Sequence, residues 1–280
     1  MWLLVVDVFR VCVWLMLLTA VFVTSERLFS LQPRRVLRPQ FWVDVGYFFL
    51  SSLLPSALLS APLAMAAWTA HRIVPADLHA AVAAAPLWLR IMATFLIGET
   101  GFYWGHRLSH EIPLLWRFHA VHHSAEHMDW LVNTRAHPVD LVFSRLCGLV
   151  PLYMAGLAGP VGASGTALPA LVVVAGTAWG FFIHANLRWR FGWLERVVAT
   201  PAFHHWHHTL DGHINKNYAA MLPWLDRIFG TFHLPPRQWP ARYGADAPVG
   251  ATLGEQLLRP LLPADPRPSI RHDPAADSAR

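Results

Sequence analysis

Long runs of apolar residues, each close to the length of a bilayer crossing, dominate this sequence. A membrane-spanning helix needs about 20 consecutive, mostly apolar residues. Five stretches approach or exceed that length, and they cover residues 2–23, 42–70, 86–105, 141–157 and 167–183. Only 14% of the 280 residues are charged and 55% are hydrophobic, whereas soluble domains average about 25% charged residues. We therefore expect an integral membrane protein, an all-α helical bundle of four to five spans.

Two of these stretches allow more than one interpretation. Residues 2–23 have the length of a span or of a signal peptide, but no basic residue precedes them as a signal peptide requires. We therefore expect a retained span, in which Asp7 and Arg10 are spaced to pair. Residues 42–70 contain Pro55 and Pro62, so this stretch is either one kinked span or a span followed by a re-entrant piece.

Arginines decide the expected orientation. They follow the first, third and fifth stretches, whereas the link between the fourth and fifth contains neither Lys nor Arg. By the positive-inside rule the arginine-bearing segments face the cytoplasm, and five spans then place the N-terminus outside. The net charge of +5 fits this topology, and no basic stripe with interleaved aromatics indicates nucleic acid.

The chain is expected to divide into two parts. Residues 1–234 form the membrane domain. Residues 235–280 are rich in proline with short charged pieces, which is typical of a peripheral cover followed by disorder.

Seventeen histidines are the second unusual feature, because most of them are clustered. One cluster follows the third stretch, and the other follows the fifth. Since the fourth and fifth stretches leave the cytoplasmic face and return to it, the two clusters are predicted to meet there. This predicts a histidine-rich helical cap on the cytoplasmic face of the bundle.

The histidine spacing favours metal binding. His106 and His110 lie four residues apart, and His119, His122 and His123 repeat a spacing of three and four. The same spacing holds for His204, His207 and His208, and residues so spaced share a helix face. With His184 at the end of the fifth stretch, the imidazoles exceed the four that one tetrahedral metal uses, so we expect two metals. Zinc storage and a pH switch are alternatives.

The three sets of spaced histidines, which we call histidine boxes, resemble those of the fatty acid hydroxylase / sterol desaturase superfamily. Further motifs of that family occur over residues 95–232 in the expected order: Tyr103-Trp104, Arg135-Ala136-His137-Pro138, His184-Ala185-Asn186, Asn217-Tyr218-Ala219, and Trp224-Leu225-Asp226-Arg227-Ile228-Phe229-Gly230-Thr231. The chain departs from the family pattern at Ala219, where glycine is usual, and at Glu99, where aspartate is common.

The resemblance implies a non-haem di-iron oxygenase that uses O2 to hydroxylate an unactivated C–H bond of a membrane lipid, either a fatty acyl chain, a sterol-like molecule or another lipid. The implied iron ligands are His106, His110, His119, His122, His123, His184, His204, His207 and His208. Zinc often replaces iron in purified proteins of this kind. Glu99, His137, Asn186 and Asp226 are expected to orient ligand rings by hydrogen bonding. Glu99 is equally compatible with a charge at the membrane interface, and His137 with a ligand or a structural role.

Electrons must come from a separate protein, such as a ferredoxin, a cytochrome b5 or a reductase. The sequence contains no dinucleotide-binding glycine motif after a strand, no ferredoxin cysteine run and no cytochrome b5 motif, so we expect no flavin, haem or nicotinamide site. Three alternatives stay open: a desaturase that uses the same site, a membrane zinc hydrolase, and a non-catalytic metal-binding protein.

Overall fold

The structure, a computed structural model, describes residues 2–33, 35–159, 167–246 and 249–262. These residues contain no β-strand and only two isolated β-bridges. The α-helices are α1 (Trp2–Phe29), α2 (Phe41–Ile73), α3 (Ala76–Ala84), α4 (Leu87–Glu111), α5 (Pro113–His123), α6 (Pro138–Met154), α7 (Ala167–His184), α8 (Pro201–His207), α9 (Trp224–Ile228) and α10 (Leu253–Leu258). Three short 3-10 helices accompany them: η1 (Trp130–Thr134), η3 (Gly192–Arg196) and η4 (Arg259–Leu261). The expected all-α class is confirmed.

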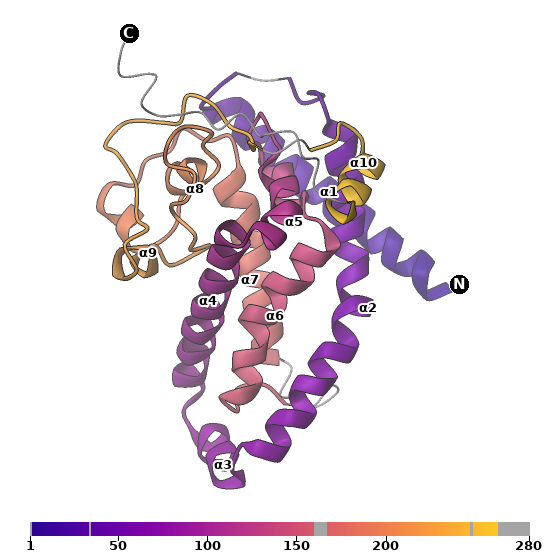
Figure 1. Cartoon of the computed structure of the whole chain (residues 1–280), viewed down its shortest axis with the longest axis vertical. Helices are drawn as coiled ribbons and strands as arrows, with labels where there is room; N and C mark the ends of the chain where they lie inside the picture. Colours follow the sequence, from indigo (N-terminus) through magenta and orange to yellow (C-terminus); the bar gives the residue numbers. More distant parts are fainter. Residues whose placement is uncertain (1, 34, 160–166, 247–248, 263–280) are drawn as a thin grey trace.

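The longest apolar helices make this an integral membrane protein. Among the described residues, three helices are long and apolar enough to cross a bilayer: residues 4–29 of α1, all of α2, and α7. A fourth crossing is obtained if α3 and α4, which are bent by 116°, count as one broken span. Helix α6, the remaining expected span, has only 17 residues. It packs between α2 and α4 in the bundle (Figure 1).

Helix α2 resolves the ambiguity at its prolines. It runs unbroken for 33 residues, with Pro55 and Pro62 inside it, so residues 42–70 belong to one continuous helix rather than to a span plus a re-entrant piece. Proline is tolerated in membrane helices because neighbouring groups satisfy the freed carbonyls.

Small residues bring α4 and α6 into close contact. A Cβ atom on Gly101 would lie 2.1 Å from the carbonyl oxygen of Cys147, and one on Gly105 would lie 2.6 Å from the Cys147 Cβ atom. Glycine at these positions lets the two backbones approach, as is common between membrane helices. The approach fixes the C-terminal half of α4, which carries His106 and His110, against the middle of α6.

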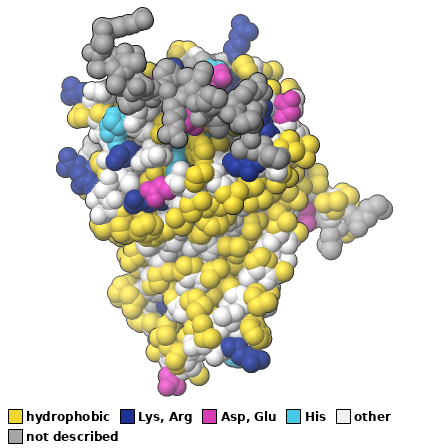
Figure 2. All heavy atoms as spheres, viewed as in Figure 1, with side chains coloured by type: hydrophobic (Ala, Val, Ile, Leu, Met, Phe, Trp, Pro, Cys, Tyr) yellow, Lys and Arg dark blue, Asp and Glu magenta, His cyan; other side chains and the backbone are white. Residues whose placement is uncertain are grey.

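The histidine-bearing segments form one layer at the end of the bundle. This layer, which we call the cap, consists of residues 112–137 and 185–246. It lies at the opposite end from α3 (Figure 1), and most charged side chains on the visible face gather on it, whereas apolar side chains cover the bundle (Figure 2).

The C-terminal segment lies against the cap as far as it is described. The Leu257 carbonyl oxygen of α10 lies 3.0 Å from Nε2 of His137 in the cap, and Thr252 and Glu255 form a capping box at the start of α10. Residues 263–280, toward the end of the tail in which disorder is expected, lie outside the described residues.

Candidate metal centre

Four helices bring the nine candidate histidines together. His106 and His110 lie in the last turns of α4, and His119, His122 and His123 end α5. His184 is the last residue of α7, while His204, His207 and His208 lie in α8 and at its C-cap. Local sequence explains where α8 begins, because Thr200 caps it by accepting a hydrogen bond from the Phe203 N–H and Pro201 occupies the first turn.

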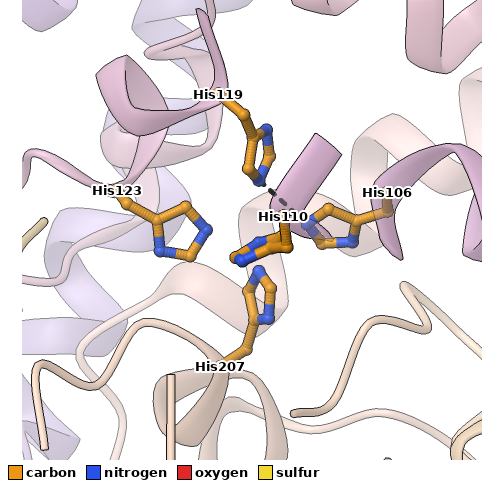
Figure 3. Close-up of side chains that lie close together, drawn as sticks. All are labelled: His106, His110, His119, His123 and His207. Atoms are coloured by element: carbon orange, nitrogen blue, oxygen red, sulfur yellow. Dashed lines mark hydrogen bonds between the residues drawn. The ribbon is translucent and has the colours of Figure 1, made fainter. Parts of the chain in front are cut away.

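The nine imidazoles separate into two groups, the only such groups of three or more potential ligands among the described residues. The first group contains His106, His110, His119, His123 and His207 (Figure 3). The second group contains His122, His184, His204 and His208. Within each group, one nitrogen atom from every ring lies within 4.8 Å of the others. The groups adjoin, since the rings of His123 and His208 stack with centroids 4.4 Å apart.

Burial lowers the pKa of several of these imidazoles and so favours their neutral form. Desolvation lowers the pKa of His122 to about 3, helped by the neighbouring His119. The pKa values of His204, His207 and His208 are held well below the ordinary value for the same principal reason, with further lowering by neighbouring histidines. A neutral imidazole carries one N–H and one lone pair, so each ring offers a metal-binding nitrogen.

Hydrogen bonds decide which nitrogen carries the proton. In the first group His106 Nδ1 lies 2.7 Å from the Tyr218 carbonyl oxygen, and His119 Nδ1 lies 3.0 Å from Asp140. In the second group His184 Nδ1 lies 2.7 Å from the Gly180 carbonyl oxygen, and His122 Nδ1 lies 3.0 Å from that of Arg135. Carbonyl and carboxylate oxygens only accept, so all four Nδ1 atoms carry a proton, and in neutral rings all four Nε2 atoms present lone pairs.

These lone pairs point at one another. The Nε2 atoms of His106 and His119 are 3.1 Å apart (dashed in Figure 3), and those of His122 and His184 are 3.2 Å apart. Between neutral rings neither contact has a proton to share, so each is repulsive unless a cation lies between the nitrogens. Two nitrogens that each bind one metal at about 2.1 Å can be no more than about 4.2 Å apart, and both separations meet this limit. The residues present therefore fit a metal ion in each group.

Unpartnered nitrogens support this fit. The Nε2 atoms of His110, His123 and His207 are buried and have no hydrogen-bond partner. Buried polar atoms without a partner are uncommon, and an ion is one of the accepted explanations. His207 Nδ1 donates to the Lys216 carbonyl oxygen, 2.9 Å away, which leaves its Nε2 free to bind the metal.

The four residues expected to orient ligand rings form their hydrogen bonds with other groups. Among the described residues, none of the four forms a hydrogen bond to any of the nine imidazoles. Glu99 accepts from the N–H groups of Met221 and Leu222, and Asn186 bonds to the backbone of Gln32. His137 caps α6 and bonds to the Leu257 carbonyl oxygen.

Asp226 is connected to the first group through the backbone of Tyr218. It accepts from the backbone N–H groups of Tyr218 and Ala219 and from the Thr231 hydroxyl. Burial raises its pKa, while these bonds lower it. The Tyr218 carbonyl oxygen in turn accepts from His106, so Asp226 fixes the backbone to which a ligand ring is bonded.

Sequence reasoning missed the carboxylate that does contact an imidazole. Asp140 lies in the first turn of α6, is 7% exposed, and bonds to His119 through one oxygen and to the Ser109 hydroxyl through the other. An acidic residue at the start of an apolar span is the signal that could have identified it.

A buried ion-pair network supports the second group. Asp44 of α2 is fully buried and binds Arg135 through two hydrogen bonds of 2.5 and 2.8 Å. Its second partner, Arg38, is 2.7 Å away and also pairs with Asp129. Since the Arg135 carbonyl oxygen accepts from His122, the network holds the backbone on which that ring depends.

Several known proteins are similar to this chain in sequence. Residues 91–231, half of the chain, match the family model described as fatty acid hydroxylase. An ornithine lipid hydroxylase of Rhizobium tropici is 37% identical over 63% of this chain and 51% of its own length. An alkylglycerol monooxygenase of Danio rerio is 35% identical over 56% of this chain and 33% of its own.

A delta(7)-sterol 5(6)-desaturase of Gibberella zeae is 28% identical over 53% of this chain and 43% of its own length. The chain thus spans about half or less of the length of these relatives. No solved structure matches it. The family match contains all nine histidines of the two groups, which confirms the resemblance drawn from the histidine boxes: this chain belongs to the fatty acid hydroxylase family.

Proposed function

We propose that this protein is an O2-dependent, non-haem di-iron oxidoreductase that hydroxylates an unactivated C–H bond of a membrane lipid. The observation that carries the proposal is the pair of lone-pair contacts, 3.1 Å in the first group and 3.2 Å in the second, which calls for one cation in each group. Imidazole ligands suit iron, zinc and copper. Family membership favours iron, with zinc as its replacement in purified protein.

The chain's own residues provide the metal ligands, fix their tautomers by hydrogen bonding and shield them from water. Nine neutral imidazoles offer lone pairs to the two positions, while carbonyl oxygens and Asp140 hold the Nδ1 protons away from them. Eight of the nine histidines are buried and His110 is partly exposed, so access of water to the two positions is limited. The bound metal pair would supply O2 activation, which no side chain can supply unaided.

The overall reaction balances with an external donor. One atom of O2 enters the C–H bond to give an alcohol, and the other leaves as water, so the reaction consumes two electrons and two protons. These electrons would come from a ferredoxin, a cytochrome b5 or a reductase. The lipid would enter from the bilayer next to the cap, and the arginine distribution places the cap on the cytoplasmic side.

Desaturation of a lipid is the second candidate. The same site would remove two hydrogens, and one relative is named a sterol desaturase. Relatives that are more than 30% identical to the chain are named a hydroxylase and a monooxygenase, which favours oxygen insertion. A zinc hydrolase, with about three protein ligands and an open position, fits nine converging imidazoles less well, and so does a carrier without catalysis.

Comparative lipid analysis tests the proposal. Membranes from cells that make the protein should contain a lipid that has gained one oxygen atom, whereas a desaturase would give a lipid lacking two hydrogens. His122→Ala and His207→Ala, one from each group, should abolish the product without affecting membrane insertion. His213→Ala removes an exposed histidine outside both groups and should leave it unchanged. Product formation that survives both ligand variants would contradict the proposed site.

A further inference from the structure

We propose that Asp140 makes the two metal positions unequal, so that the first group binds its ion more tightly than the second. This inference rests on the proposed function, because it presumes two bound metals. It assigns Asp140 as a positioning residue that acts through His119.

Asp140 is the one carboxylate among the described residues that hydrogen-bonds to any of the nine imidazoles. Its Oδ2 atom lies 3.0 Å from His119 Nδ1, and its Oδ1 atom accepts from Ser109 at 3.3 Å. In the second group the rings of His122 and His184 donate to neutral carbonyl oxygens instead. The first group therefore has five imidazoles and an adjacent anion, whereas the second has four imidazoles and no such anion.

Among the described residues, His119 is the only ionisable side chain that pairs with the carboxylate of Asp140. Asp140 is 7% exposed, and no lysine or arginine of the described chain forms an ion pair with it. An unpaired buried charge is expensive. A cation bound by His119 Nε2 would help to balance it, because only the imidazole ring lies between that nitrogen and the carboxylate.

A carboxylate behind a ligand histidine has two effects. It fixes the Nδ1–H tautomer and the ring orientation, and it makes Nε2 a stronger donor to the metal. Substitution of such a partner typically weakens metal binding about 10- to 100-fold. Because Asp140 contacts only the first group, its substitution should weaken only one of the two metal-binding constants.

Metal titration of the full-length protein in lipid nanodiscs tests this. Metal-depleted protein is titrated with Co²⁺ against a chelating indicator, and the absorption of each bound Co²⁺ is followed. The wild type should bind two ions with different affinities. Asp140→Asn keeps the shape and an acceptor oxygen but loses the charge, and it should weaken the tighter constant about 10- to 100-fold and leave the other unchanged. Asp140→Glu should restore part of the affinity.

Glu195→Ala is the matched control, because Glu195 is also a buried carboxylate of the cap but pairs with Arg190 and not with an imidazole. It should leave both constants unchanged. Equal weakening of both constants in Asp140→Asn, or no change in either, would overturn the inference while leaving the proposed function intact. A wild-type protein that binds fewer than two ions would contradict the proposed function and the inference with it.

Discussion

Removing Asp44 should destabilise the protein severely, because this carboxylate balances two buried arginines. Its side chain is fully buried, and the side chains of Arg38 and Arg135 are 4% and 1% exposed. Loss of one partner from a buried pair costs about 3–5 kcal/mol, since a charge stays behind without compensation. Asp129 still pairs with Arg38, and Gln40 still bonds to Arg135, so the lower end of that range applies to Asp44→Ala.

A cost of about 3 kcal/mol corresponds to a fall in Tm of roughly 6–12 °C for a chain of this size. Thermal unfolding of the metal-free protein in detergent measures it, so that lost metal binding does not contribute. Glu111→Ala is the control: Glu111 pairs with Arg107 in a partly exposed bridge, for which about 1 kcal/mol or less is expected. If Asp44→Ala lowered Tm no more than Glu111→Ala, the buried network would not be stabilising the fold.

Three further outcomes follow from the packing and the site. Gly101→Ala should destabilise the bundle by about 1–3 kcal/mol, because its Cβ would meet the Cys147 carbonyl. Gly176→Ala should not destabilise the bundle, because no atom lies within 4 Å of the added Cβ. Thermal unfolding of the two variants compares them. Asp226→Ala removes the acceptor that holds the Tyr218 backbone and should lower metal content, measured by elemental analysis. Chelation of the metals should lower unfolding stability by about 2.7 kcal/mol for each occupied position, relative to protein with free metal at 100 times the Kd of that position.

The candidate ligands could be read from sequence because their spacing is a local property. A separation of three or four residues places side chains on one face of any helix, and the reversal of the chain between 141 and 183 returns the second cluster to the first. Both inferences need only helix geometry and hydropathy. The structure accordingly brings all nine predicted histidines into the two groups.

The hydrogen-bond partners of these rings could not be predicted in the same way. Glu99 lies two helical turns before His106, but it faces the backbone of Met221 and Leu222 instead of a ring. Asp140 is 21 residues from His119 in sequence, and the contact forms only because α4, α5 and α6 pack together. Such contacts depend on tertiary packing, which no local spacing encodes.

The division of the histidines between the two groups follows from the angle between helix positions. Each residue turns an α-helix by about 100°. The side chains of residues i and i+4 therefore differ in direction by about 40°, whereas those of residues i+3 and i+4 differ from each other by about 100°. In α5, His119 and His123 belong to the first group and His122 to the second. In α8 the roles reverse, because His204 and His208 belong to the second group and His207 to the first.

Each of these two helices therefore holds both metal positions at once. A displacement of α5 or α8 that opens one group must also move a ligand of the other, so the two positions cannot be adjusted separately by moving a helix. Independent adjustment requires a contact that reaches a single ring. Asp140 on His119 and the Arg135 carbonyl oxygen on His122 are contacts of this kind. Of these two contacts, only that of Asp140 is made by a side chain, so a substitution at Asp140 can alter the first group alone without displacing α5 or α8.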